Sequence, residues 1–140
     1  MPISDADSLR ELLDADRIAV VGCSSTPGKA AHEVPAYLQE HGYEIVPVNP
    51  FADEILGETA VDSLSEIDDE IDLVDVFRPS EEVAGIADET IARMESVGDV
   101  ETLWLQLGIS DDAAAEKAEA AGLDVVQDRC LKVEHDRLIG

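Results

Sequence analysis

The sequence predicts an α/β protein built on a single doubly wound parallel sheet of five strands. Short apolar runs, rich in Val, Ile and Leu, alternate with longer segments of helical periodicity along the 140 residues, which is typical of repeated strand–helix–strand units. Each run is nearly continuous in hydrophobicity, as expected of strands that are buried on both faces. The length fits one domain, so we expect residues 1–140 to form one Rossmann-like unit.

Five apolar runs are the expected strands. They cover residues 18–21, 45–48, 73–77, 103–107 and 123–126. Pro47 lies within the second run, and because proline has no N–H to donate, we expect the pairing of that strand to fail near its carboxyl end. Right-handed crossovers between the strands most simply predict the order 3-2-1-4-5 across the sheet.

Helix signals separate the strands. Four helices are expected, over about residues 5–14, 31–41, 83–94 and 111–121. The third has apolar residues at spacings of three and four, which places them along one stripe of the helix. Ser80 is the expected N-cap of the third helix and Ser110 that of the fourth, and Gly122 is expected to end the fourth.

The chain is strongly acidic. Nine Lys and Arg stand against 33 Asp and Glu, and the formal net charge of −24 would repel the phosphates of nucleic acids and of anionic lipids. We therefore expect neither nucleic acid nor a membrane as a partner. The carboxylates are spread along the whole sequence, which is typical of halophilic proteins whose self-repulsion is screened by salt. The Met-Pro-Ile-Ser start lacks the basic and apolar regions of a signal peptide, so a cytoplasmic location is expected.

The loop after the first strand has the composition of a phosphate-binding loop. In an open parallel sheet, ligands bind beyond the carboxyl ends of the strands, and here a run of small residues leads into a helix whose free N–H groups attract anions. Gly22 allows close approach of the backbone, and Lys29 supplies positive charge. The hydroxyls of Ser24, Ser25 and Thr26 can donate to phosphate oxygens.

This loop departs from two standard nucleotide-binding motifs. Ser24 and Pro27 stand where the dinucleotide fingerprint has its second and third glycines, and Ala30 stands where a Walker loop has the hydroxyl that holds magnesium. An NAD site places an acidic residue at the end of the second strand, but this chain has Asn49 and Pro50 there. These differences disfavour NAD, although a NAD(P)-binding or regulatory nucleotide domain stays an alternative.

Two further strand ends carry candidate ligand-binding residues. The third strand continues into Phe77, Arg78 and Pro79. Arg78 places a permanent cation beside the predicted phosphate loop, and Phe77 offers a flat apolar surface for a ring. The fourth strand ends with Gln106 and Gly108, a carboxamide and a glycine at the same edge of the sheet. Gln106 is equally suited to holding the neighbouring loops together.

Five segments taken together strongly resemble the CoA-binding protein family. They are residues 47–50, 55–57, 76–79, 104–109 and 128–132. The family shares its fold with the CoA-binding domains of the succinyl-CoA synthetase alpha subunit and of NDP-forming acyl-CoA synthetases. The resemblance covers about residues 5 to 137 and implies a Rossmann-like module that binds coenzyme A or an acyl-CoA as its small-molecule ligand.

The resemblance also assigns positions to the ligand. Residues 24–27, with Gly22 and Lys29, resemble the segment that receives the phosphates and the nucleotide part of CoA, while residues 77–79 and 49–50 resemble two further contact segments. In the synthetases a separate domain carries a phosphorylated histidine and an ATP-grasp partner supplies the phosphate. No histidine of this chain matches that residue, so the resemblance implies binding of CoA and does not imply synthetase activity. The sequence alone leaves open whether the chain is an enzyme.

Two thiols remain, and they do not form a disulfide framework. CoA itself ends in a thiol, so Cys130, which Arg129, Lys132 and His135 flank in the sequence, is a candidate for a mixed disulfide with it. A thiol-redox or acyl-transfer enzyme that uses Cys130 as nucleophile is the alternative, whereas Cys23 is expected to be a small buried residue. No spacing of His and Cys matches a zinc site. The sequence does not determine the oligomeric state, and a homodimer is one of the alternatives.

Overall fold

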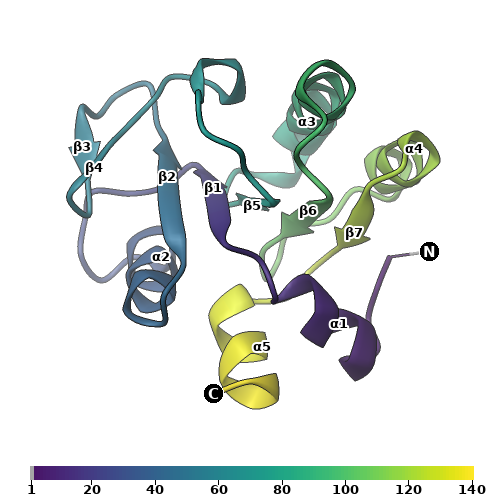
Figure 1. Cartoon of the computed structure of the whole chain (residues 1–140), viewed down its shortest axis with the longest axis horizontal. Coiled ribbons are helices and arrows are strands. Elements are labelled where there is room, and N and C mark those ends of the chain that lie inside the picture. Colours follow the sequence, from purple (N-terminus) through teal and green to yellow (C-terminus); the bar gives the residue numbers. More distant parts are fainter. Residues whose placement is uncertain (1) are drawn as a thin grey trace.

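The computed structural model describes residues 2–140 and contains a parallel five-stranded sheet with helices on both faces (Figure 1). The strands are β1 (Arg17–Val21), β2 (Glu44–Val48), β5 (Leu73–Val76), β6 (Thr102–Leu105) and β7 (Asp124–Val126). Each lies on one of the five apolar runs, and most of their residues are buried. The predicted α/β class, with one doubly wound Rossmann-like sheet, is therefore confirmed.

The order of the strands differs from the prediction. The observed order is β2-β1-β5-β6-β7. When the five strands are numbered along the chain, this order is 2-1-3-4-5. The predicted order 3-2-1-4-5 is therefore wrong. The third strand, β5, pairs with β1 over its whole length, from Leu73 opposite Ile18 to Val76 opposite Val21. The chain thus leaves β2 at an edge and returns to the other side of β1.

Pro47 explains why β2 lies at the edge. Its carbonyl accepts a hydrogen bond from the N–H of Val61 at 3.0 Å, so the proline nitrogen, which carries no hydrogen, also faces the outer side of the strand. A strand without that donor cannot pair fully with an outer neighbour. Toward β1 the ladder continues past Pro47, with Val48 opposite Val21. The expected failure of pairing near Pro47 is therefore wrong on the β1 side.

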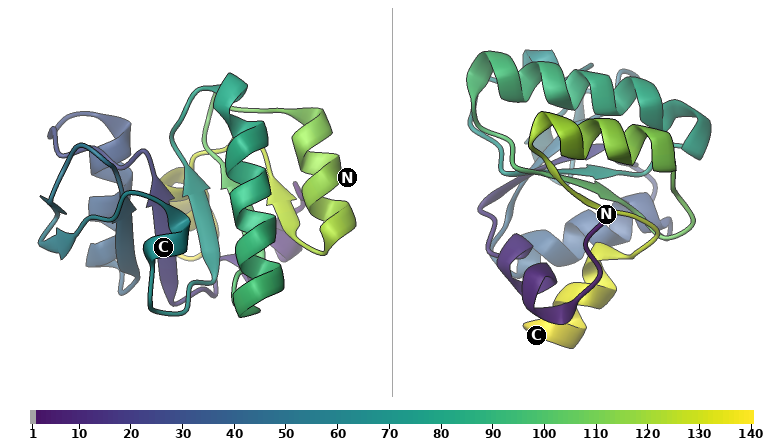
Figure 2. Two further views of the ribbon diagram at one scale, coloured as in Figure 1. Left: turned by 90° about the horizontal axis from the view of Figure 1, so that it is seen from above. Right: turned by 90° about the vertical axis from the view of Figure 1, so that its right-hand side faces the viewer.

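Helices cover the two faces of the sheet unequally. They are α1 (Ala6–Leu12), α2 (Ala30–Glu40), α3 (Val83–Val97), α4 (Asp112–Ala121) and α5 (Leu131–Leu138). Figure 2 shows α3 and α4 on one face and α1, α2 and α5 on the other. The first four helices confirm the predicted ones within a few residues, whereas α5 was not predicted. None of the helices in residues 2–140 has the length and apolar character needed to cross a lipid bilayer.

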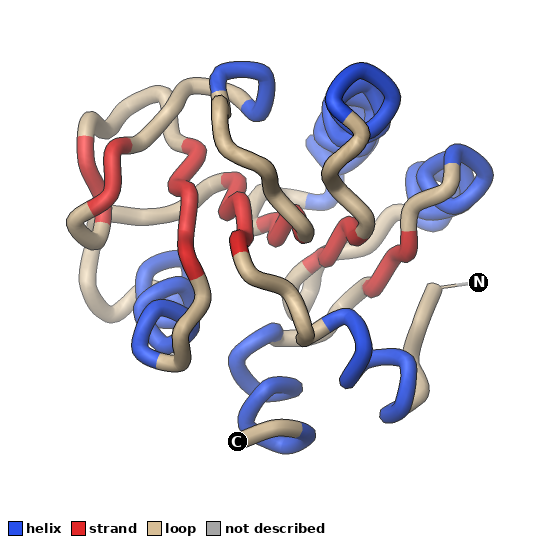
Figure 3. The backbone as a smooth tube through the Cα atoms, viewed as in Figure 1, coloured by secondary structure: helices blue, strands red, loops and turns tan. Residues whose placement is uncertain are grey.

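The connection from β2 to β5 contains no α-helix. It holds the short hairpin β3 (Glu54–Ile55) and β4 (Glu58–Thr59) and a 3₁₀ turn, η1 (Leu64–Glu66), and Figure 3 shows it as mostly loop. A second 3₁₀ turn, η2 (Ser80–Glu82), precedes α3. All four elements are too short to produce a periodic apolar pattern, which is why the sequence does not predict them.

Two predicted helix caps are wrong. The N-cap of α4 is Asp111, one residue after Ser110, and its carboxylate accepts a hydrogen bond from the N–H of Ala114 at 3.1 Å. Ser80 lies in η2, and its hydroxyl accepts a hydrogen bond from the N–H of Ser110 at 3.1 Å. The two serines thus join the loops that follow β5 and β6. Gly122 ends α4 in the left-handed conformation, as predicted.

Candidate functional site

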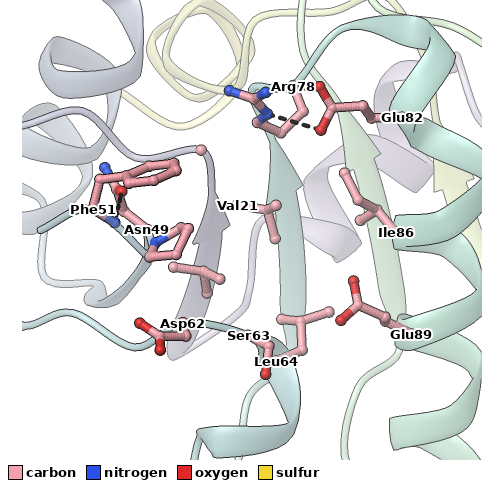
Figure 4. Close-up of a pocket in the computed structure, with 13 residues that line it drawn as sticks. Val21, Asn49, Phe51, Asp62, Ser63, Leu64, Arg78, Glu82, Ile86 and Glu89 are labelled. Carbon is pink, nitrogen blue, oxygen red and sulfur yellow. Dashed lines mark hydrogen bonds and ion pairs between the residues drawn. The ribbon is translucent and has the colours of Figure 1, made fainter.

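A cavity of about 360 Å³ opens at the carboxyl ends of β1 and β2 (Figure 4). Its walls come from these strand ends, from η1 and the residues before it, and from the segment from Arg78 through the first turns of α3. After β2 the chain crosses back over β1 to form β5, so the direction of winding reverses between β1 and β5. In open α/β sheets, ligands bind at such a reversal point.

Four predicted ligand-binding residues line this cavity. They are Gly22, Asn49, Pro50 and Arg78. The loop from Ser24 to Lys29 continues from Gly22 toward α2 but does not line the cavity. Phe77 packs into the apolar cluster on the α2 face of the sheet, and Pro79 is the residue before η2. The cavity and the loop thus meet at Gly22.

Gly22 and Arg78 lie against each other. Gly22 has a φ of +85°, and a Cβ added to it would lie 2.8 Å from Cδ of Arg78 and 3.2 Å from the carbonyl oxygen of Phe77. Only glycine therefore allows the aliphatic part of Arg78 to cross the end of β1 at this point. Beyond that crossing the guanidinium of Arg78 forms an ion pair with Glu82 at 2.7 Å (Figure 4).

Asn49 connects the ends of the two strands. Its side-chain N–H donates to the carbonyl of Cys23 at 2.9 Å, and its Oδ1 accepts from the N–H of Phe51 at 2.8 Å. The amide therefore holds the loop after β1 against the turn after β2. This turn presents Phe51, 94% exposed, at the rim of the cavity. Sequence analysis did not single out Phe51, although it directly follows the Asn49-Pro50 pair.

The predicted phosphate loop is held by hydrogen bonds within the protein. The hydroxyl of Ser24 accepts from the N–H of Thr26 at 3.0 Å, and the N–H of Gly28 donates to the carboxylate of Glu33 at 2.7 Å. That second bond lowers the pKa of the Glu33 carboxyl below its usual range. Ser25, Pro27 and Lys29 are exposed, and Lys29 is the N-cap residue of α2. The loop thus has the exposed cation that was predicted, but one of its N–H groups already holds a carboxylate.

Gln106 and Gly108 lie at a different part of the same edge. The buried carboxamide of Gln106 accepts a hydrogen bond from the N–H of Leu131 at 3.1 Å, and the N–H of Gly108 donates to Asp128 at 2.6 Å. Both contacts hold the loop after β6 to the segment around the start of α5. Neither residue lines the cavity.

The two thiols have different environments. Cys23 is fully buried, and burial, followed by the nearby carboxyl of Asp75, raises the pKa of its thiol to about 12. The predicted role of Cys23 as a small buried residue is thereby confirmed. Cys130 is half-buried and is the N-cap residue of α5, where its side chain makes no capping hydrogen bond.

The groups that flank Cys130 in the sequence are engaged with other partners. Arg129 forms an ion pair with Glu134 at 2.8 Å. The Nδ1 atom of His135 is hydrogen-bonded to the hydroxyl of Tyr37 at 2.8 Å, and burial followed by the nearby His41 lowers the pKa of His135. Lys132 lies over the ring of Tyr37, with its Nζ atom 5.4 Å from the ring centroid. The three flanking groups thus each have a partner other than Cys130.

Arg93 fixes the wall of the cavity from behind. This buried side chain of α3 donates to the carbonyls of Leu64, Ile67 and Asp69 at 2.8 to 2.9 Å and pairs with Asp99 at 2.9 Å. Burial alone would raise the pKa of Asp99, but the hydrogen bonds from Arg93 and other donors bring it below its usual value. The position of η1, whose Leu64 lines the cavity, depends on this cation.

Asp75 is a buried acid in the central strand β5. It is fully buried, and neither of its carboxyl oxygens has a hydrogen-bond partner among residues 2–140. Burial raises its pKa well above the usual value, because the charged form of a carboxyl is disfavoured away from water. The sequence signal was a single carboxyl within the apolar run 73–77, but sequence analysis did not use it. Within residues 2–140 no cluster of three or more His, Cys, Asp or Glu side chains is arranged to hold a metal ion.

The chain is similar to several known proteins over most of its length. Residues 16–136 match the sequence model of a family described as a CoA binding domain. The uncharacterized protein YneT of Bacillus subtilis is 43% identical over 128 residues, which are 91% of each chain. An ADP-forming acetate–CoA ligase II of Archaeoglobus fulgidus is 32% identical over 106 residues, covering 74% of this chain but only 15% of that protein. A hypothetical protein from Pyrococcus horikoshii OT3 superposes with a TM-score of 0.91 at 35% identity, covering 100% of this chain and 97% of that one.

Proposed function

This chain belongs to the CoA binding domain family, and from that premise we propose that it binds coenzyme A, or an acyl ester of it, at the carboxyl edge of its sheet. The observation that carries the proposal is the contact between Gly22 and Arg78. It places a cation and a glycine backbone side by side at the reversal point of the sheet, next to a cavity of about 360 Å³.

The charges around the site indicate which part of CoA lies where. Arg78 lies against Gly22 and the exposed Lys29 ends the loop after β1, and we assign the phosphates of CoA to these two cations. The opposite end of the cavity is lined by Asp62 and Glu89 (Figure 4). Carboxylates accept hydrogen bonds and repel phosphates, so this end suits uncharged donors such as the hydroxyl and amino groups of the nucleoside. Phe51 at the rim offers a face on which an aromatic base can stack.

The proposed site does not favour NAD. In NAD sites an acidic side chain at the end of the second strand binds the ribose. At that position this chain has Asn49, whose amide is already hydrogen-bonded to Cys23 and Phe51. Nor does the structure favour an acyl-transfer enzyme, because His135 is hydrogen-bonded to Tyr37. We therefore propose a binding function without turnover, with the cofactor as the small-molecule partner.

Replacing Arg78 by alanine tests the assignment of the phosphates. If Arg78 donates to a phosphate of CoA, Arg78→Ala weakens binding by roughly 1.5 to 3 kcal/mol, the scale of a charge-assisted hydrogen bond. The measurement is a calorimetric titration with CoA. Arg10→Ala is the matched control, since the side chains of Arg78 and Arg10 are 47% and 48% exposed and each pairs with one carboxylate. Equal affinities of the two variants would contradict the assignment.

We also propose that Cys130 forms a mixed disulfide with CoA. It is the accessible thiol of the two, whereas burial holds Cys23 in the unreactive protonated form. With CoA disulfide as the oxidant, the thiolate of Cys130 attacks one sulfur, a Cys130–CoA bond forms and one CoA thiolate leaves. Intact mass spectrometry should then show one added CoA that a reductant removes, in wild type and in Cys23→Ser but not in Cys130→Ser. An unmodified wild-type chain would end this part of the proposal.

A further inference from the structure

Arg78, the cation assigned to the phosphates, is already bound by an anion of the protein. Its Nε and Nη2 atoms donate to the two carboxylate oxygens of Glu82, at 3.2 and 2.7 Å. Both residues line the same cavity and lie beside each other in Figure 4. The hydrogen bonds from Arg78 lower the pKa of the Glu82 carboxyl, so Glu82 is ionised at neutral pH.

The backbone places this pair together. Glu82 follows Arg78 by four residues across Pro79 and the 3₁₀ turn η2. The aliphatic part of Arg78 is pressed against Gly22, so the guanidinium can turn while its stem stays in place. The two side chains are 47% and 45% exposed, and an ion pair this exposed to water stabilises a protein only weakly. A stronger anion can therefore displace Glu82 at small cost.

A phosphate and Glu82 compete for the same guanidinium. Arg has five N–H donors, and the carboxylate uses two of them. A phosphate bound at the remaining edge would lie beside the carboxylate, where two like charges a few ångströms apart repel each other. Exchange of the carboxylate for the phosphate avoids that repulsion and keeps the bidentate geometry that both anions prefer.

From these contacts we propose that Glu82 is a competing anion within the site, which a phosphate of the ligand must displace from Arg78 in order to bind. The proposal rests on the proposed binding of CoA. It names Glu82 as the residue that a phosphate of CoA must replace on Arg78. Glu82 occupies the cation when the ligand is absent, and it disfavours ligands whose anionic group is too weak to replace a carboxylate. Phosphorylated ligands can displace Glu82 from Arg78. Ligands that carry only a carboxylate gain no affinity from the exchange, because they replace one carboxylate by another.

The test compares Glu82→Gln with Glu81→Gln in calorimetric titrations with CoA. Both variants remove one negative charge from the same 3₁₀ turn, but only Glu82 contacts Arg78. In molar KCl, where the Debye length is about 3 Å, long-range effects of charge are screened and competition by direct contact persists. We expect Glu82→Gln to bind CoA about two- to fivefold more tightly than wild type, which is the strength of an exposed ion pair, and Glu81→Gln to match wild type.

A double variant shows whether the gain acts through Arg78. In an Arg78→Ala background, Glu82→Gln should give no increase in affinity, because the cation for which Glu82 competes is gone. Weaker binding by Glu82→Gln, or a gain equal to that of Glu81→Gln, would overturn the proposal while leaving CoA binding intact. If wild type and all variants fail to bind CoA, the proposed function itself fails, so the two failures are distinguishable.

Discussion

Asp75→Asn should make the folded chain more stable, and the gain should grow as the pH rises. Burial raises the pKa of Asp75 well above its usual value in the folded chain, whereas in the unfolded chain the carboxyl ionises near pH 4. Folding therefore requires uptake of a proton above that pH. This costs about 1.4 kcal/mol per pH unit up to the folded pKa. Asparagine has the same shape and does not ionise.

Urea unfolding of wild type and Asp75→Asn between pH 4 and pH 8 measures this effect. The two free energies of unfolding should be nearly equal at pH 4, below which the carboxyl is protonated in both states, and should diverge above it. Asp124→Asn, at an exposed position of β7, is the control and should show no such divergence. A wild type that is as stable as Asp75→Asn at pH 8 would show that Asp75 is ionised and has a partner in the folded protein.

Arg93→Met should strongly destabilise the folded chain. It removes the donors to three backbone carbonyls and leaves the carboxylate of Asp99 buried, with its side chain only 4% exposed, without its cation. Loss of one partner of a buried ion pair costs about 3 to 5 kcal/mol. The segment of residues 64–69 also loses its attachment to α3, so the wall of the cavity that contains Leu64 should loosen.

The control for Arg93 is an exposed ion pair between α3 and α4. Lys117 of α4 pairs with Asp88 of α3 at 2.7 Å, with side chains 65% and 56% exposed, and Lys117→Met should change the free energy of unfolding by less than about 1 kcal/mol. Adding Asp99→Leu to Arg93→Met should cost less than the sum of the single changes, because the unpaired carboxylate disappears. Equal effects of Arg93→Met and Lys117→Met in urea unfolding would contradict the role assigned to Arg93.

The sequence contained enough to predict the strands and most helices but not their arrangement. Continuous apolar runs identify buried strands because burial on both faces leaves no polar alternation. The order of the strands depends instead on which edge of β2 is open, and that depends on which side the nitrogen of Pro47 faces. Hydrophobicity does not carry this information. The helix α5 was missed because most of its residues are polar, and two of its three buried residues, Glu134 and His135, carry ionisable side chains.

Part of the cavity lining was predictable from the sequence, but the contacts of these residues were not. Gly22, Asn49 and Arg78 were singled out because they follow strand ends, and strand ends meet at one edge of a parallel sheet. Their partners come from backbone turns that sequence spacing does not reveal, as in the pairing of Arg78 with Glu82 across a 3₁₀ turn. Cys130 shows the converse, since its sequence neighbours contact other residues once α5 forms.

The most direct test of the central claim is a calorimetric titration of the wild-type chain in molar KCl with CoA, dephospho-CoA, NAD and NADP. If the cations Arg78 and Lys29 and the cavity next to Gly22 form a CoA site, CoA binds saturably with one site per chain, and NAD and NADP bind far more weakly. Weaker binding of dephospho-CoA would show that the 3′-phosphate is also recognised. Saturable binding of NAD together with no heat from CoA would contradict the claim.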